Sequence, residues 1–476
     1  MNFNSRYNFY VQYQGNVALY NTLTGAFVKL VGEDGESLAI SLCGRKSKFD
    51  LESFESYILG LLVKGGFLVS SPEEETETIR SRFARAREET PVVLTLTTTM
   101  DCNLGCYYCY EQRSQKKLTT NHVADIIDLA KASLERQNKR SLHVDWYGGE
   151  PMLNQTFLED ASSSLQKLCN ELKVSYHASI ISNGTCWPKD VERFIKQNRI
   201  RQVQISLDGL RNNHNKRRRY RKEFVDLAKQ SSFDECIELI DKLLDYTRVD
   251  VRFNFDKQNS VDWSGLLEMA QKRNWFKKPY KAVIQPARIS AYSEHSSFMR
   301  NAELSFEEFQ FIRTAIKKHL PENVTVEESE IPDGFPYPRF SVCAALAKDS
   351  VVVGAEGALY RCGLQVGENN RIVGELGASQ SFIPLPQLSQ TPINNDSKWW
   401  DNFDVTELPK CSKCSYMPIC WGGCPKKHLE GDTHALDEQT KYWHKNLPKQ
   451  IAKRAEFSIE TIKEFGEQHQ FRVGWD

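Results

Sequence analysis

The stretch Val92-VLTLTTTMDCNLGCYYC-Tyr110 joins a strand-like run of apolar and β-branched residues to a loop with three cysteines. Cys102, Cys106 and Cys109 have the spacing C-x3-C-x2-C. Three thiolates on one short loop can hold three irons of a [4Fe–4S] cluster, whereas clusters that only carry electrons normally have four protein ligands. No fourth ligand follows nearby. The spacing therefore predicts one iron that is open to a small molecule, and chemistry at that iron.

The other cysteines narrow the class of protein further. The chain has 476 residues and 13 cysteines, and no charged segment followed by an apolar run opens it. Cysteines without a secretion signal argue for metal binding or catalysis rather than for a disulfide framework. Some lie outside the spaced sets, and we interpret these as buried small apolar residues: Cys43, Cys169, Cys186 and Cys236.

The charge balance leaves no net field for nucleic acid or an anionic membrane, because 62 Lys and Arg stand against 62 Asp and Glu. No apolar run reaches the roughly 18 residues that a membrane span needs. We therefore expect a cytoplasmic protein of several domains, with neither nucleic acid nor a membrane as its partner.

Residues 1–72 show the pattern of a small α+β domain. Two alternating runs flank Gly15 and Asn16, which is a hairpin signal, and residues 50–66 are typical of a helix that ends at glycine. This order of hairpin and helix suggests a winged-helix module. Residues 73–90 are charged and weakly helical, and we interpret them as a linker.

Residues 91–290 alternate between apolar strand runs and helical patterns, the signature of βα units on a parallel sheet. The predicted strands are residues 92–98, 142–147, 176–182, 203–207, 250–255 and 282–285. The predicted helices are residues 120–138, 154–173, 188–198, 233–246 and 263–273. Six strands are too few for a complete barrel. The expected fold is therefore α/β with a partial (β/α)6 TIM-like barrel, whose ligands bind at the carboxyl ends of the strands.

The pattern changes beyond this barrel. We interpret residues 291–342 as a bridge. Residues 343–445 are rich in cysteine, glycine and turn residues, so bound metal would have to stabilise an irregular C-terminal iron–sulfur domain there. Residues 446–476 form the C-terminal segment, with a helix expected over residues 447–468.

Candidate cofactor-binding residues follow the second and third predicted strands, at the carboxyl-terminal edge of the sheet. Glu150, in Gly148-Gly149-Glu150, offers an anion to an ammonium group, and the two glycines let backbone approach a ligand closely. Ser182 and Asn183 carry hydroxyl and amide groups that suit ribose hydroxyls.

The fourth and fifth strands add further polar groups. The fourth ends near Ser206, and Arg218 further on can pair with a carboxylate. Arg252, Asn254 and Asp256 alternate on the fifth strand, so all three are expected on one face. Together, the strand-end groups can accept an ammonium, a carboxylate, a ribose and an adenine. This set predicts S-adenosylmethionine (SAM), with its methionine end on the open iron.

With these motifs, residues 91–290 resemble the core of the radical SAM superfamily. The resemblance implies that Cys102, Cys106 and Cys109 hold the cluster and that Tyr108 packs near adenine. It implies further that Glu150 binds the SAM amino group, Ser182 the ribose, Ser206 the ribose or carboxylate, and Arg218 the carboxylate. The implied reaction is reductive cleavage of SAM to a 5′-deoxyadenosyl radical that abstracts hydrogen from a substrate. A structural zinc knuckle is the alternative for this loop.

The basic segment His214-NKRRRY-Arg221 has two interpretations. The resemblance assigns Arg218 to the His-x-x-x-Arg stretch that supplies a carboxylate-binding arginine, and we expect the remaining charges on a solvated helix face. An RNA-binding patch is the alternative, but the segment lacks interleaved stacking aromatics.

A second cysteine set resembles the SPASM extension, which holds auxiliary [4Fe–4S] clusters in peptide-modifying radical enzymes. Its members are Cys343, Cys362, Cys411, Cys414, Cys420 and Cys424. The resemblance implies that Cys343, Cys362 and Cys424 bind the first auxiliary cluster and that Cys411, Cys414 and Cys420 bind the second. One tetrahedral zinc ion on Cys411–Cys424 is the alternative.

The SPASM pattern ends with one more cysteine, which this chain lacks after Cys424. His444 lies where it would fall, and imidazole can ligate an iron–sulfur cluster and raise its potential. A surface histidine without such a role is the other interpretation. The departure from the pattern puts the fourth ligand of the second cluster in doubt.

The N-terminal module resembles the winged-helix domains of maturases that modify ribosomally made peptides. Such a domain would bind the leader of a precursor peptide as an added strand and hold the core peptide at high effective concentration. DNA binding is the alternative, but the segment 50–58 is acidic rather than basic.

The leading hypothesis is therefore a radical SAM peptide maturase, whose reaction is a crosslink, an epimerisation or a related modification. The auxiliary clusters would take up the surplus electron, and a flavodoxin or ferredoxin would supply reducing electrons. One alternative is a sulfatase-type formylglycine maturase; that group has an aspartate directly after the cysteine matched by Cys362, whereas Gly363 stands here. A peptide-binding or electron-transfer scaffold without catalysis is the other.

Overall fold

The computed structural model describes residues 3–43, 56–136, 138–292, 294–321, 335–377 and 396–457. The chain forms two compact units. Unit 1 contains Met1–Glu89, Glu328–Cys343 and Asn402–Asp476, and unit 2 contains Thr90–Glu327 and Ala344–Asp401. Residues 343–445, which the sequence assigns to one domain, are thus divided between the two units.

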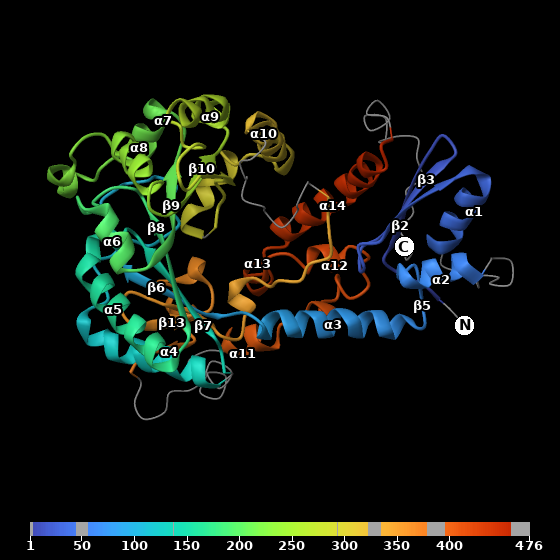
Figure 1. Ribbon diagram of the computed structural model, residues 1–476, viewed down its shortest axis with the longest axis horizontal. Helices are drawn as coiled ribbons and strands as arrows, with labels where there is room; N and C mark the ends of the chain where they lie inside the picture. The colour runs from blue at the N-terminus through green and yellow to red at the C-terminus, as the bar shows by residue number, and fades with distance from the viewer. Residues whose placement is uncertain are drawn as a thin grey trace. The chain divides into compact units, whose positions relative to one another are not determined.

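Unit 2 is built on a nine-stranded sheet with the order β11-β10-β9-β8-β7-β6-β12-β13-β14. Strands β6 to β11 pair in parallel, each with its neighbour in sequence. Their bounds are Val92–Thr99, Ser141–Gly148, Ser175–Ser182, Ile200–Leu207, Arg248–Phe255 and Val283–Arg288. This arrangement confirms the predicted α/β fold with its partial barrel (Figure 1).

Helices connect these strands, as the sequence predicts (Figure 1). They are α4 (Val123–Arg136), α5 (Gln155–Leu172), α6 (Val191–Gln197), α7 (Arg211–Arg217), α8 (Ser232–Leu243) and α9 (Trp263–Lys272), and α10 (Phe306–His319) follows β11. Apolar residues of α4, α5, α6, α8 and α9 share one buried core with the strands. Fully burying one large aliphatic or aromatic side chain of this kind contributes about 1.5–3 kcal/mol.

The two faces of the sheet differ because side chains alternate along a strand. On β7, Leu142, Val144 and Trp146 belong to the apolar core with the helices. On β10, Val251 and Phe253 do the same. The residues between them point to the other face of the sheet, inside the partial barrel, and many of these are polar. The alternation therefore places charged and polar side chains where the site lies.

Three short strands extend the barrel sheet beyond β6, and the sequence analysis missed them. They are β12 (Ser350–Val353), β13 (Ala358–Tyr360) and β14 (Gly374–Glu375). β12 pairs in parallel with β6, and the Val93 amide donates to the carbonyl of Asp349. The strands are short, and they were hidden in a segment whose cysteines and glycines predicted irregular structure.

Unit 1 contains a three-stranded antiparallel sheet with the order β2-β3-β4. Its elements in the first part of the chain are β1 (Phe3–Asn4), β2 (Asn8–Tyr13), β3 (Asn16–Asn21), β4 (Phe27–Val31), α1 (Gly32–Cys43), α2 (Ser56–Lys64) and β5 (Leu68–Val69). The predicted hairpin around Gly15 is present, and Gly15 has φ +74. Part of the helix predicted over 50–66 lies outside the described residues.

The stretch expected to be a linker forms the helix α3 (Pro72–Glu88). The Ser71 side chain accepts from the Glu74 amide, and Pro72 occupies the first turn, which is a strong start for a helix. The Arg87 side chain donates to the Phe403 carbonyl over 2.9 Å. These contacts fix the segment within unit 1.

The C-terminal part of unit 1 contains α12 (Met417–Cys420), α13 (Pro425–Leu429) and α14 (Thr433–Arg454). The helix predicted over 447–468 is wrong in its start, because α14 begins at Thr433 and continues through Pro448; residues 458–468 lie outside the described part. Trp443, Leu447 and Ile451 of α14 share a core with Phe9 and Tyr20 of the N-terminal sheet. The C-terminal helix thus packs on the N-terminal module.

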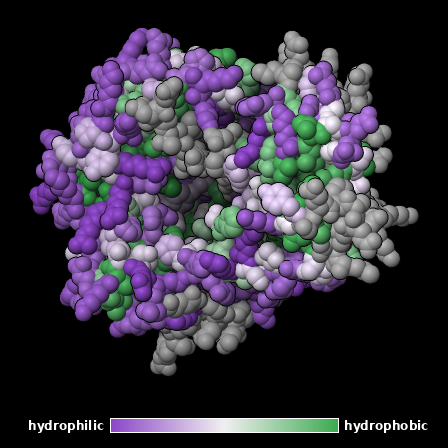
Figure 2. All heavy atoms as spheres, turned by 45° about the vertical axis from the view of Figure 1, so that its right-hand side comes forward, coloured by the Kyte–Doolittle hydropathy of each residue, from purple (hydrophilic) through white to green (hydrophobic). Residues whose placement is uncertain are grey.

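Much of the face drawn in Figure 2 is hydrophilic, with hydrophobic side chains gathered in patches. In unit 1, the helix α2 exposes Tyr57, Leu61 and Val63 to solvent. Within the described ranges, no helix combines the length and the hydrophobicity that crossing a membrane requires.

Asp349 allows a test of how β12 joins the barrel. Its carboxylate is buried and pairs with Arg136 and with Lys139, 3.1 Å from the Lys139 Nζ. We expect Asp349→Ala to lower the free energy of unfolding by about 3 kcal/mol, because two cations lose their partner at a buried site. Urea denaturation measures the loss. Glu192→Gln, at the exposed pair with Lys196, is the matched control and should leave the free energy of unfolding nearly unchanged. Equal losses in the two variants would contradict this account.

Candidate functional site

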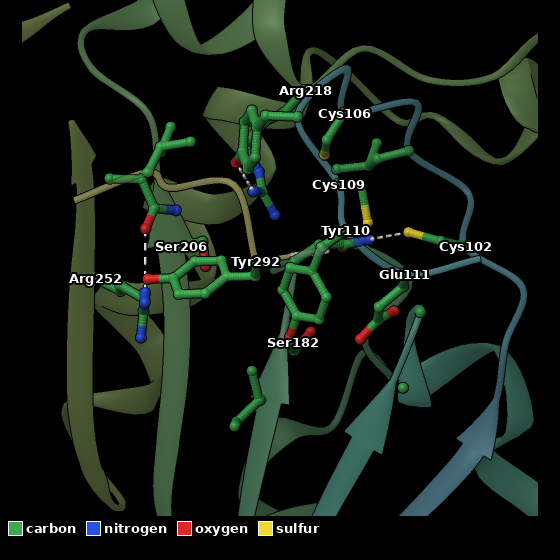
Figure 3. A pocket seen from close by; sticks show the side chains of 18 of the residues that line it. Cys102, Cys106, Cys109, Tyr110, Glu111, Ser182, Ser206, Arg218, Arg252 and Tyr292 are labelled. Atoms are coloured by element: carbon green, nitrogen blue, oxygen red, sulfur yellow. Dashed lines mark hydrogen bonds between the residues drawn. The ribbon is translucent and has the colours of Figure 1, made fainter. Parts of the chain in front are cut away.

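A cavity of about 440 Å³ lies at the carboxyl ends of the barrel strands (Figure 3). This volume is within the usual range for small-molecule sites. The cysteine loop after β6 forms one wall, and Arg252 and Tyr292 stand on another. The predicted residues that line it are Cys102, Cys106, Cys109, Tyr108, Gly148, Gly149, Ser182, Asn183, Ser206, Arg218, Arg252 and Asn254.

The cysteine loop is held in place by hydrogen bonds to its backbone. Asp101 accepts from the Cys102 amide and pairs with Arg221. Arg221 also donates to the Cys102 carbonyl over 2.8 Å, and Arg113 donates to the Cys106 carbonyl over 2.9 Å. These contacts hold the backbone of the loop on both sides of Cys102 and at Cys106.

Burial raises the pKa of each thiol on this loop, and that of Cys109 reaches about 12. All thirteen cysteines are free. Of the four scattered ones, Cys43, Cys169 and Cys236 are buried, while Cys186 is half-buried. Within the described residues, no three His, Cys, Asp or Glu side chains are close enough together to hold a single metal ion.

Gly148 and Gly149 let the end of β7 meet the backbone around the cysteine loop. A Cβ at Gly148 would lie 2.3 Å from the Thr99 carbonyl oxygen, and φ is +123 there. A Cβ at Gly149 would lie 2.3 Å from the Asp101 carbonyl oxygen. Both glycines line the cavity, but the close approach that they permit is to the protein's own chain.

Glu150 is fully buried and does not line the cavity. Its carboxylate accepts from the Ser182 hydroxyl over 2.9 Å, from the Asn183 amide over 2.7 Å and from the Met152 amide over 3.1 Å. Burial raises its pKa to about 7, although these hydrogen bonds oppose the shift. Glu150 therefore fixes the end of β8, and its direct contact with a ligand stays a prediction.

Ser182 and Asn183 are held in one orientation at the end of β8. The Ser182 hydroxyl accepts from the Trp187 indole over 3.0 Å. The Asn183 side-chain nitrogen lies 3.6 Å from the Cys102 sulfur, a contact visible in Figure 3, and 2.8 Å from the Asn103 side-chain oxygen. A donor to a ligand sulfur stabilises a reduced cluster and raises its potential.

Arg218 reaches the cavity from the end of α7. It donates to the Tyr108 hydroxyl over 2.6 Å and lies 3.6 Å from an Asp208 oxygen. Its Nε is buried without a hydrogen-bond partner. Burial lowers the pKa of Arg218, but the Cys106 sulfur, the Tyr108 hydroxyl and Asp208 favour the charged form and hold it above its usual value. A buried cation with a free donor can bind a carboxylate.

The expectation of a solvated helix face around Arg218 holds for Lys216 and Arg219, which are exposed, but is wrong for two other residues. His214 and Arg217 are buried, and burial lowers the pKa of His214 to about 3. Arg217 donates to Asp256 over 2.7 Å, which turns this carboxylate away from the group formed by Arg252 and Asn254. Arg217 and Arg218 thus form a structural ion network with Asp208 and Asp256, because a buried arginine needs an acidic partner.

Several residues of the cavity were missed by the sequence analysis. These residues are Tyr110, Glu111, Tyr147, Arg288, Tyr292 and Leu364. Tyr110 and Glu111 follow the last cysteine directly, and Tyr147 precedes the paired glycines, so their positions were a usable signal. Nothing in the sequence pattern around Leu364 or Tyr292 indicates the cavity.

The second cysteine set is divided between the units. Cys343 and Cys424 are exposed in unit 1, while Cys362 belongs to unit 2, so their common site stays a prediction. The remaining three line a cavity of about 530 Å³ in unit 1, together with His444: Cys411, Cys414 and Cys420.

Known proteins are similar to large parts of this chain. Residues 96–269 match the family described as the radical SAM superfamily. A cysteine-type anaerobic sulfatase-maturating enzyme of Clostridium novyi (strain NT) is 23% identical over 345 residues, 68% of this chain and 85% of that protein. An Fe-coproporphyrin III synthase of Methanosarcina barkeri (strain Fusaro / DSM 804) is 25% identical over 227 residues, 47% of this chain and 50% of that protein.

Two solved structures share the fold. Native anSMEcpe with bound AdoMet and Cp18Cys peptide has a TM-score of 0.52 and 18% identity, covering 70% of this chain and 89% of that chain. Streptococcus suis SuiB bound to the precursor peptide SuiA has a TM-score of 0.50 and 15% identity, covering 89% of this chain and 95% of that chain.

Gly149 provides a test of the packing between β7 and the cysteine loop. We expect Gly149→Ala to push the Asp101 carbonyl away and to lower the iron bound after anaerobic reconstitution, measured by iron analysis and absorbance. Gly60→Ala is the matched control, because a Cβ at Gly60 meets nothing within 4 Å, and its iron content should not change. An unchanged iron content in Gly149→Ala would contradict the proposed packing.

Proposed function

Because residues 96–269 belong to the radical SAM superfamily, we propose that this chain is a radical SAM peptide maturase. The observation that carries the proposal is the convergence of Cys102, Cys106 and Cys109 with Arg218 on one cavity. Three thiols and a cation with a free donor are the groups that a [4Fe–4S] cluster and the carboxylate of SAM require. The donor set therefore fits both cofactors.

When bound, a reduced cluster and SAM supply a 5′-deoxyadenosyl radical that abstracts hydrogen from the substrate. The protein's part is to hold and orient these groups. The three cysteines bind the cluster, and the fixed backbone of the loop sets its position. Arg218 pairs with the SAM carboxylate, and Tyr108, whose hydroxyl accepts from Arg218, packs near the adenine.

The strand ends complete the SAM site in this proposal. Ser206 and the segment Ser182-Asn183 bind the ribose, and Gly148 and Gly149 line the cavity beside them. Glu150 acts in two ways. Its carboxylate positions Ser182 and Asn183, as its hydrogen bonds support, and it attracts the SAM amino group electrostatically.

The substrate is a ribosomally made precursor peptide in our proposal. Two similar structures contain bound peptides. In unit 1, β4 (Phe27–Val31) pairs with β3 and ends the sheet, so its other edge can accept a leader as an added strand. Such binding uses the backbone and tolerates varied leader sequences. It also holds the modified part of the peptide at high effective concentration.

The second cysteine set holds auxiliary [4Fe–4S] clusters in this proposal. Cys343, Cys362 and Cys424 bind the first, and Cys411, Cys414 and Cys420 contribute to the second. A flavodoxin or ferredoxin supplies the electron for SAM cleavage. If the product is a crosslink, the auxiliary clusters accept the electron that the substrate loses when the new bond forms.

A sulfatase-type maturase is the second candidate, because the Clostridium novyi relative carries that name. Its activity would convert a cysteine or serine side chain to formylglycine. Gly363 stands after Cys362, where that group has an aspartate, so the proposed base is absent. A peptide-binding scaffold without catalysis is the third candidate, and the intact cavity argues against it.

Formation of 5′-deoxyadenosine tests the proposal. The anaerobically reconstituted chain with dithionite and SAM should form it, and the variant Cys102→Ala/Cys106→Ala/Cys109→Ala should give only the background without enzyme. Cys169→Ala, a buried cysteine away from the cavity, should retain activity. Absence of 5′-deoxyadenosine from the reconstituted native chain would favour the scaffold.

The substrate is identified by co-expression with candidate precursors and tandem mass spectrometry. Loss of two hydrogen atoms indicates a crosslink, and deuterium uptake from solvent without mass change in normal water indicates epimerisation. Formylglycine in a sulfatase-derived peptide would replace the leading proposal by the second candidate.

A further inference from the structure

The cavity of about 530 Å³ in unit 1 gathers thiols from one irregular loop. The loop turns at Cys411 and Cys414, whose amides donate to the carbonyls of Leu408 and Cys411 over 2.9 Å each. It then enters α12, which ends at Cys420. Trp421, at φ +48, and the two glycines after it reverse the chain with positive φ. The three sulfurs are thereby carried to one cavity on a loop shaped by backbone turns.

Helix α14 forms the facing wall. Leu436, Thr440 and Trp443 line the cavity, and they are three or four residues apart, so they share one face of the helix. His444 continues this face from the same turn as Trp443. The helix therefore brings an imidazole to the three cysteines across a gap of more than twenty residues in sequence, counted from the last of them.

The His444 ring is oriented by Tyr416. The two rings stack with centroids 4.6 Å apart and an interplanar angle of 21°. Tyr416 is buried and lies between Cys414 and Cys420 in sequence, so the stack fixes the imidazole beside the cysteine loop. Among the described residues, no side chain or backbone group forms a hydrogen bond with the His444 ring nitrogens.

Other polar side chains of this cavity are already engaged. The His428 Nε2 lies 2.6 Å from the Gly422 carbonyl oxygen. Asp437 pairs with Lys410 over 3.4 Å. The Gln439 side-chain nitrogen lies 3.6 Å from the Cys420 sulfur. Gln439 is therefore a hydrogen-bond donor to this sulfur and not itself a candidate metal ligand. His444, an exposed residue at the cavity wall, is the imidazole there whose ring nitrogens have no hydrogen-bond partner among the described residues.

We propose that this cavity holds an iron–sulfur cluster whose ligands are Cys411, Cys414, Cys420 and His444. The inference rests on the proposed function only in treating the chain as an iron–sulfur protein. A neutral imidazole in place of a thiolate makes the cluster less negative and raises its reduction potential. The Gln439 donor at the Cys420 sulfur acts in the same direction.

The test is pulsed electron paramagnetic resonance on the full, anaerobically reconstituted chain after dithionite reduction. A directly bound imidazole gives a nitrogen hyperfine coupling that changes on labelling with 15N-histidine. His444→Cys should keep the iron content, lose this coupling and lower the midpoint potential of one cluster. His434→Gln is the matched control, because His434 is exposed on the same helix and does not line the cavity. It should leave the coupling unchanged.

Several results would overturn the inference. Zinc in place of iron at Cys411, Cys414 and Cys420 would do so, as would a coupling that persists in His444→Cys or disappears in His428→Gln. Full cluster occupancy without any histidine coupling in the native chain would also do so. If 5′-deoxyadenosine still forms in His444→Cys while the coupling is lost, the proposed function and this inference both stand. If neither the native chain nor His444→Cys forms 5′-deoxyadenosine, but the nitrogen coupling is present in the native chain and absent from His444→Cys, only the proposed function fails.

Discussion

The cysteine loop meets the end of β7 backbone against backbone, and the position of the three thiols depends on this contact. Gly149 leaves room for the Asp101 carbonyl, and Gly148 leaves room for the Thr99 carbonyl. The Asp101 side chain then binds the Cys102 amide and Arg221. A short loop that carries the three proposed ligands is thereby held by its surroundings, and such support from neighbouring groups is what a precisely placed ligand set requires.

Two buried arginines inside the barrel are neutralised by two buried aspartates. Asp208 lies 3.6 Å from both Arg217 and Arg218, and Asp256 binds Arg217 more closely. Buried charges of this kind are costly unless each has a partner. The arrangement leaves Arg218 charged and partly uncommitted at the cavity wall. The same ion network thus stabilises the loop after β9 and places a cation at the cavity wall.

The barrel could be predicted from sequence because its signal is local. Alternation of apolar residues fixed which face of β7 or β10 meets the helices, and polar residues at strand ends indicated the cavity. The orientation of individual side chains was harder to predict from sequence. Glu150 was expected to face a ligand, but its carboxylate is turned toward Ser182 and Asn183, and only the three-dimensional structure could show these donors.

Burial and pairing between residues distant in sequence account for the other differences between the predicted and the observed structure. Arg217 lies in a basic run that is typical of solvent exposure, and its buried partner Asp256 is distant in sequence. β12 is a short strand, and its pairing with β6 spans most of the barrel sequence, so no local pattern could reveal it. The sequence left His444 open between two interpretations, and its place on α14 beside the cysteine loop could not be read from a local pattern.

The central claim is that one iron of the N-terminal cluster is open and binds SAM. Electron–nuclear double resonance of the reduced cluster, with SAM labelled by 15N at its amino group and 17O at its carboxylate, tests this most directly. The account predicts couplings from both labels that vanish in the Cys102→Ala/Cys106→Ala/Cys109→Ala variant. A fully assembled cluster that shows neither coupling at saturating SAM would contradict it.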